Sequence, residues 1–111
     1  MPFVARFSHP RLDDVPLTAV LHALGDPVRL GIVARLAMGA AMNCTTACPG
    51  EAVPKSTLSN HLRILREAGL IETVQSGRDG LNSLRREAFD ARFPGLLDSV
   101  LAQQCGGARP A

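Results

Sequence analysis

Three cysteines are the residues in this sequence best suited to covalent or metal chemistry. Cys44 and Cys48 lie four residues apart in the segment NCTTACPG (43–50), and Cys105 lies near the carboxyl end. If a short helix begins at Asn43 and stops before Pro49, the first two thiols share one helical face. Two such thiolates, with Cys105 as a third ligand, could bind a soft ion such as As(III), Hg(II) or Cd(II).

Two other interpretations of these cysteines remain open from the residues alone. Cys44 lies near the N-terminus of the expected helix, where the helix dipole favours a reactive thiolate that could pair with Cys48 or Cys105 on oxidation. Alternatively, all three are packing residues, because cysteine is among the most buried residue types. A four-thiolate zinc site within one chain is excluded, because the chain has only three cysteines.

A second group of side chains is suited to binding nucleic acid. In the run KSTLSNHLRILREAGL (55–70), three leucines repeat at helical spacing, and short polar residues with one arginine occupy the opposite face. Short polar side chains can hydrogen-bond base edges, phosphates or bridging waters, and long cations suit phosphates. The candidate DNA-binding residues are Lys55, Ser56, Thr57, Ser59, Asn60, His61, Arg63 and, in the turn that follows, Arg78.

Two of these candidates have more than one possible role. Asn60 has a side chain that can recognise adenine, but it could equally contact a phosphate. His61 lies beside the leucine stripe, which indicates a half-buried structural histidine as an alternative to a base contact.

The elements that would position these residues follow one another along the chain. We expect an irregular N-terminal arm over residues 1–15, a domain over 16–105 and a flexible tail over 106–111. Within the domain, the pattern first predicts a helix from Pro16 to Gly25 and a second helix capped by Asp26 and closed by Gly39. The short helix at 43–48 and a longer helix at 55–68 follow. The chain then forms a β-hairpin at 70–85, with its turn at 77–80, and a final helix after Pro94-Gly95. This order predicts a mainly α winged helix-turn-helix, in which the helix at 55–68 enters a major groove and the hairpin is the wing.

Composition narrows the class of protein further. The 111 residues are enough for one domain, and the 46% hydrophobic and 20% charged content is that of a globular chain. Aromatic residues make up only 4%, so the core must be aliphatic. We find no apolar run long enough to span a membrane and no secretory signal, so we expect a cytoplasmic protein with reduced thiols and no membrane partner.

The runs LHALGDPVRLGIVARL (21–36) and STLSNHLRILREAGLI (56–71), with SGRDG (76–80) at the wing tip, resemble the ArsR/SmtB family of bacterial winged-helix repressors. The resemblance covers roughly residues 17–104. It implies a homodimer formed through the first and last helices, with the two recognition helices on a pseudo-palindromic DNA operator. It also implies a repressor whose DNA affinity falls when an effector binds or a thiol is modified.

The resemblance extends only partly to the family's sensing sites. The arsenic-sensing members have a Cys-x-Cys-x-x-Cys run, on which only Cys48 falls, with Asn43 and Thr45 at the other two places. Zinc-sensing members use Asp and His on the final helix, which here offers Asp98 and no histidine, so we expect no zinc site. Some redox and persulfide sensors pair an early cysteine with one in the last helix, a place that Cys105 resembles. Release by oxidation or persulfidation is therefore the leading hypothesis, and a soft metal or metalloid ion is the alternative.

Two other classes of function are less consistent with these residues than a repressor. A winged helix can also be a protein-interaction module with inert cysteines, but the concentration of polar residues at 55–63 disfavours it. An enzyme is not expected, because the Cys-x-x-x-Cys spacing differs from thioredoxin-like motifs, and no phosphate-binding glycine loop or catalytic triad is evident.

Overall fold

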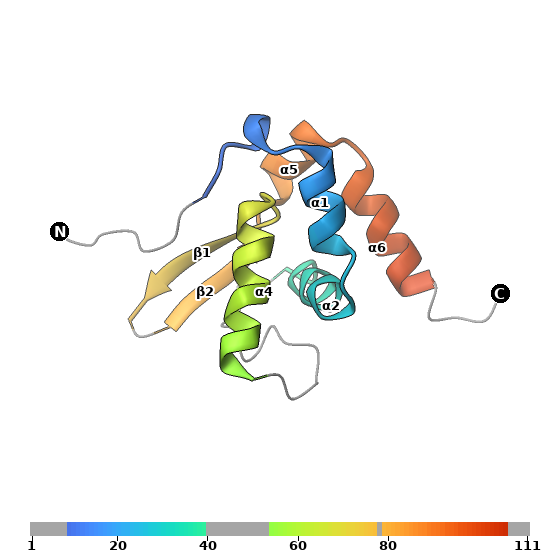
Figure 1. The fold of residues 1–111 in the computed structure, drawn as a ribbon. Coiled ribbons are helices and arrows are strands. Elements are labelled where there is room, and N and C mark those ends of the chain that lie inside the picture. Colours follow the sequence, from blue (N-terminus) through green and yellow to red (C-terminus); the bar gives the residue numbers. More distant parts are fainter. Residues whose placement is uncertain (1–8, 40–53, 78, 107–111) are drawn as a thin grey trace.

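The computed structural model describes residues 9–39, 54–77 and 79–106 of the chain. Figure 1 shows a helical body with a two-stranded hairpin extending from one side. The elements are η1 (Leu12–Asp14), α1 (Leu17–Leu24), α2 (Pro27–Leu36), α4 (Lys55–Glu67), β1 (Ile71–Ser76), β2 (Asp79–Leu84), α5 (Arg86–Arg92) and α6 (Leu96–Gly106). The predicted fold class, mainly helical with a small hairpin, is confirmed. The short helix expected at 43–48 lies outside the described residues.

The α1–α2 corner forms where the sequence predicts it. Helix α1 ends at Leu24 before Gly25, and Asp26 is the N-cap of α2. The Asp26 carboxylate accepts hydrogen bonds from the backbone N–H groups of Val28 (2.9 Å) and Arg29 (3.1 Å), and Pro27 occupies the first turn, where no N–H is needed. The cap fixes where α2 begins and therefore the angle at which the chain turns.

Helix α4 packs through the predicted leucine stripe and then stops abruptly. Leu58, Leu62 and Leu65 are buried. After the helix, Gly69 adopts a positive φ of 76°, its N–H bonds to the Arg66 carbonyl, and the N–H of Leu70 bonds to the Leu65 carbonyl. This pair of bonds is a Schellman motif, which ends the helix and turns the chain directly into β1.

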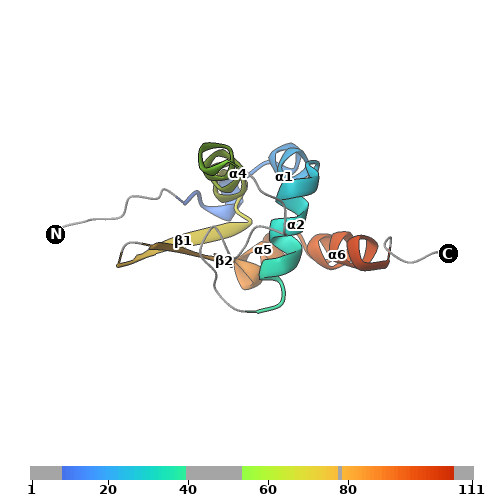
Figure 2. The ribbon, with the colours of Figure 1, turned by 90° about the horizontal axis from the view of Figure 1, so that it is seen from below.

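The hairpin is antiparallel, with Thr73 opposite Asn82 and Ser76 opposite Asp79. Asp79 and Gly80 belong to β2, so the connection is shorter than the turn predicted over 77–80. Gly77 has φ 61°, a left-handed conformation that glycine adopts without strain and that two-residue hairpin loops require. Figure 2 shows the hairpin on one side of the helical body and α6 on the other.

Two elements near the chain ends were not predicted. Within the expected irregular arm, η1 forms, and Leu12 and Val15 are buried. Helix α5 forms over a stretch for which we predicted no helix. Its Phe89 is fully buried and packs against Phe93 with ring centroids 5.1 Å apart. These aromatic side chains join an otherwise aliphatic core.

The core is one cluster that draws on every helix and on both ends of the described chain. Its apolar members are Leu12, Val15, Val20, Ala23, Leu24, Ile32, Val33, Leu36, Leu58, Leu62, Leu65, Ala68, Leu70, Ile71, Phe89, Phe93 and Leu97. In residues 9–39, 54–77 and 79–106, no single helix is long and apolar enough to cross a membrane; α1 and α2 meet that criterion only as a pair bent by 98°.

Hydrogen bonds join the N-terminal segment to the hairpin and to α5. Their acceptors are backbone carbonyls of the segment and the imidazole of His9. Arg85 Nη1 donates to the Pro10 carbonyl at 2.8 Å, and Arg92 donates to the carbonyls of Leu12 and Val15, both at 3.1 Å. The backbone N–H of Thr73 donates to Nε2 of His9 at 3.0 Å. This last bond requires His9 to be unprotonated at Nε2.

This contact predicts an acid-sensitive contribution of His9 to stability. Partial burial, followed by the positive charge of Arg85 and Arg66, lowers the pKa of His9 below 6.5, although Glu72 raises it. Because folding favours the neutral imidazole, the contribution is fully present above pH 6.5 and is lost as the pH falls through the folded-state pKa. Urea unfolding between pH 7.5 and 5 should show a smaller acid loss of stability in His9→Gln than in the wild type. The control His22→Gln should keep the wild-type loss, and equal pH profiles for His9→Gln and the wild type would contradict the prediction.

Candidate nucleic-acid interface

One face of α4 carries the predicted polar side chains and is open to solvent. Ser56, Thr57, Ser59 and Asn60 are exposed, together with the two cations Lys55 and Arg63. Figure 1 shows this helix beside β1, with the hairpin alongside it. The structure therefore brings six of the eight candidate DNA-binding residues onto one exposed helix surface next to the wing.

The guanidinium of Arg63 is already engaged by other residues of this face. Its Nη1 donates to both carboxylate oxygens of Glu67 at 3.2 Å, and its Nη2 donates to Oδ1 of Asn60 at 2.5 Å. The three residues are spaced i, i+3, i+7 and are all exposed. Glu67 was not among the predicted site residues, although its spacing from Arg63 is the usual one for a helical ion pair.

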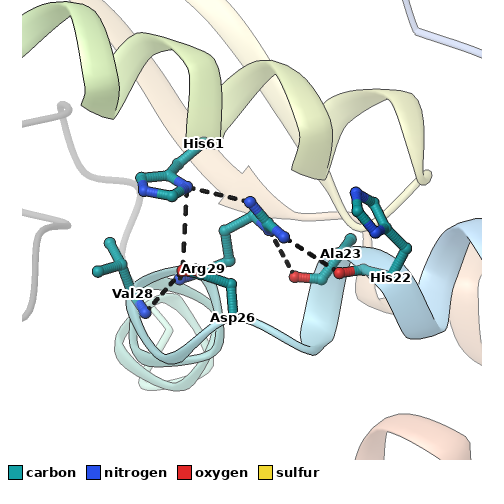
Figure 3. Close-up of polar contacts among 6 residues, drawn as sticks. All are labelled: His22, Ala23, Asp26, Val28, Arg29 and His61. Carbon is teal, nitrogen blue, oxygen red and sulfur yellow. Dashed lines mark hydrogen bonds and ion pairs between the residues drawn. The ribbon is translucent and has the colours of Figure 1, made fainter.

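His61 points away from the exposed face and into a buried polar network (Figure 3). Its side chain is 13% exposed, and its Nδ1 lies 3.1 Å from Nη1 of Arg29. Because a guanidinium can only donate, Nδ1 must accept, and the proton of the neutral imidazole is on Nε2. This geometry fits a half-buried structural histidine, the role considered for His61 beside a base contact. A DNA contact through Nε2 stays a prediction.

Arg29 is the centre of this network and is itself buried, at 7% exposure. Its Nε donates to the Ala23 carbonyl at 2.8 Å and its Nη2 to the His22 carbonyl at 3.1 Å, so it caps the end of α1 (Figure 3). The same guanidinium thus joins α1, α2 and α4. We did not predict this role, although the sequence holds a signal for it: Arg29 falls on the apolar stripe of α2 with Ile32, Val33 and Leu36.

Asp26 completes the network from the start of α2. Burial tends to raise the pKa of its carboxyl group, but the hydrogen bond from the Arg29 N–H and the nearby guanidinium charge outweigh this and lower the pKa. The carboxylate also lies 3.9 Å from Nδ1 of His61. This contact is not an ion pair while Nδ1 accepts a hydrogen bond from Arg29, because that nitrogen then carries no proton.

A second polar network joins α4 to the wing. Arg66 Nη1 donates to Oγ1 of Thr73 at 3.1 Å, and that hydroxyl donates to Oδ1 of Asn82 at 2.6 Å. Thr73 and Asn82 are buried opposite each other in the hairpin. Since buried polar groups are costly unless paired, this network fixes the orientation of the hairpin relative to α4.

The remaining predicted site residues are not brought into this interface. Arg78, Cys44 and Cys48 lie outside the described residues, and Cys105 falls within the bounds of α6 in a part whose side chains are not described. Among the described residues, no group of three or more His, Cys, Asp or Glu side chains is placed to bind a metal ion. The proposed sensing roles of the three cysteines remain predictions.

Several known proteins resemble this chain in sequence or in fold. A family model described as a helix-turn-helix domain matches residues 24–74. YceK of Bacillus subtilis (strain 168), an uncharacterised HTH-type transcriptional regulator, is 34% identical over 89 residues, which are 79% of this chain and 89% of that protein.

Solved structures of transcriptional regulators resemble this chain in fold. An ArsR family transcriptional regulator superposes with a TM-score of 0.62 at 23% identity, covering 86% of this chain and 98% of that one, which shows a common fold. The transcriptional repressor BigR from Xylella fastidiosa superposes with a TM-score of 0.55 at 25% identity, covering 74% of this chain and 84% of that one.

The Arg29 network predicts a specific loss of stability. Lysine keeps the charge but lacks the planar fork, so Arg29→Lys cannot reach the Ala23 and His22 carbonyls and His61 at once. Leaving buried acceptors unpaired should lower the free energy of unfolding by about 1–3 kcal/mol. Urea unfolding with an unchanged denaturant slope is the measurement. Arg11→Lys, at an exposed arginine on the surface, is the control and should change little; an equally small effect at Arg29 would contradict the assigned role.

Proposed function

Because the chain belongs to the ArsR/SmtB family of winged helix-turn-helix transcriptional regulators, we propose that it is a homodimeric repressor released from its operator by thiol chemistry. It regulates transcription and binds DNA, as the family does. We place it in the cytoplasm, where the chromosome of a bacterium is accessible. The observation that carries the proposal is the exposed polar face of α4. One polar network ties this helix to α1 and α2, and a second ties it to the hairpin.

The proposed mode of binding inserts α4 into the major groove. The polar side chains of the exposed face, from Lys55 to Arg63, meet base edges and phosphates, and the wing, with Arg78, contacts the neighbouring backbone or minor groove. A recognition helix must be held rigidly to distinguish one base from another. The Arg29–His61 and Arg66–Thr73 bonds supply that rigidity, which supports DNA recognition over a general docking surface.

The proposed dimer uses the first and last helices, as the resemblance implies. Two leucines of α1, Leu17 and Leu21, are one turn apart and about half exposed, at 47% and 50%. Near α6, a groove of about 390 Å³ is lined by Leu30, Ser99, Val100, Gln103 and Gln104. Apolar surface of this kind is what a second copy of the chain would cover. Two recognition helices would then address a pseudo-palindrome with half-sites one helical turn apart.

The proposed release mechanism rests on the sequence. Oxidation or persulfidation of Cys44 or Cys48, alone or paired with Cys105, would act on the segment directly before α4. To release DNA, the modified form must favour a dimer that binds the operator less well than the reduced form does. Binding of As(III) or Hg(II) by the same thiols is the alternative effector chemistry.

The DNA-binding proposal predicts that the chain selects a defined duplex from a randomised pool. Arg63→Ala and Asn60→Ala should each weaken binding to that duplex by about 1–3 kcal/mol, because each removes contacts of the recognition helix. Fluorescence anisotropy at physiological salt measures the change, with Arg11→Ala as a control on an exposed arginine outside α4. Absence of any preference over random DNA would refute the proposal, and tolerance of charge reversal on α4 would favour a protein-interaction module instead.

The release proposal predicts which thiols matter. Binding to the selected duplex is titrated after treatment of the protein with a reductant, with peroxide or with polysulfide, and after addition of As(III) or Hg(II). Peroxide or polysulfide should weaken binding of the wild type by roughly tenfold or more. Replacing the responsible cysteine, in Cys44→Ser, Cys48→Ser or Cys105→Ser, should abolish that response. Release by the metal ions alone would support the alternative effector, and release under none of these conditions would contradict any sensing role.

A further inference from the structure

The contacts of Arg63 bear on what this side chain recognises in DNA. In the free protein Arg63 is paired with Glu67, because its Nη1 lies 3.2 Å from each of the two carboxylate oxygens. The Arg63 and Glu67 side chains are 53% and 62% exposed, so DNA would meet the pair and not the isolated cation. A second contact, from Nη2 to Oδ1 of Asn60 at 2.5 Å, orients the same guanidinium along the helix.

A carboxylate beside the guanidinium disfavours contact with a phosphate. An unpaired surface arginine binds the DNA backbone of any sequence, because neutralising a phosphate releases a condensed counterion. Here a phosphate approaching Arg63 would also meet the negative charge of Glu67, or Arg63 would have to abandon that partner. The gain from a non-specific backbone contact is therefore reduced at this position.

The same contacts determine which hydrogen-bonding groups remain available. Since Oδ1 of Asn60 accepts from Arg63, the group that Asn60 offers outward is its NH₂, a donor. Arg63 has only donors, and not all of them are taken by Glu67 and Asn60. In the major groove, guanine presents two adjacent acceptors, N7 and O6, whereas adenine pairs an acceptor with a donor. Two neighbouring donor side chains match guanine.

We infer that Glu67 is a positioning residue, which with Asn60 holds Arg63 for a guanine in the major groove and lowers affinity for DNA of unrelated sequence. This inference rests on the proposed function, because it requires α4 to lie in the major groove. It changes the expected role of Arg63 from a phosphate contact to a base contact. It also gives Asn60 a donor role in place of the adenine recognition considered from the sequence.

The test compares Glu67→Gln with Glu87→Gln, a matched control. Glu87 is exposed on α5, a helix that contacts η1 and α6, and its change removes the same single charge. The probes are the duplex that the wild type selects from a randomised pool and a scrambled duplex of equal length and composition. Dissociation constants are measured from 50 to 300 mM KCl, and the pool selection is repeated with each variant.

The expected result is a loss of selectivity without a loss of binding. Glu67→Gln should bind the scrambled duplex about 3- to 10-fold more tightly, and its log–log salt slope should steepen by about one unit relative to Glu87→Gln, since Arg63 becomes free for a phosphate. A guanine enriched in each half-site by the wild type should be enriched less by Glu67→Gln. Arg63→Lys, a point charge without the planar fork, should lose the same guanine preference while keeping affinity for the scrambled duplex.

Equal selectivity and equal salt slopes for Glu67→Gln and Glu87→Gln would overturn the inference, as would a wild-type site in which no guanine depends on Arg63. These outcomes leave the proposed function intact, because the wild type would still select a sequence. A wild type that selects no sequence would refute the proposed function and, with it, the inference.

Discussion

The structure depends on a single buried guanidinium. Arg29 links three helices. It belongs to α2, its guanidinium caps the carbonyls at the end of α1, and it donates to His61 of α4. A buried charge is costly unless each of its donors is paired, so the three helices can take few arrangements other than this one. The leucines of α4 supply the free energy of packing but, being non-directional, do not set its rotation. The bond to His61 adds the direction, and it turns the opposite, polar face of α4 outward.

The wing is positioned by a second constraint that starts from the same helix. The Schellman motif at Gly69 leads the chain straight from α4 into β1, and Arg66, Thr73 and Asn82 then bond across the junction. The bond from Arg66 to Thr73 therefore ties the helix to the hairpin. Bending the two apart to follow DNA would require breaking this bond, so we expect the duplex, rather than the protein, to adapt.

The features that could be predicted from the sequence depend on residues a few positions apart, whereas those that could not depend on contacts between distant parts of the chain. The Asp26 cap, the leucine stripe of α4 and the hairpin are local patterns, in which residues a few positions apart determine the outcome. The Arg29–His61 bond joins residues 32 positions apart, and no local pattern specifies it. Helix α5 is only seven residues long and is stabilised by burial of Phe89 in the common core, which its own periodicity does not indicate. The exposed residues of α4 were predicted from their spacing, whereas their mutual contacts, Glu67 with Arg63 above all, depend on rotamers that spacing leaves open.

We propose that the hydrogen bonds of Arg29 and Arg66 hold α4 in the orientation in which it enters the major groove. Methylation interference on the selected duplex tests it most directly, because methyl groups at guanine N7 lie in the major groove and those at adenine N3 lie in the minor groove. Interference at guanine N7 should occur in two clusters separated by about one helical turn, and Asn60→Ala should weaken it there. Interference confined to adenine N3, or none at any guanine N7, would contradict the placement of α4 and the proposal that depends on it.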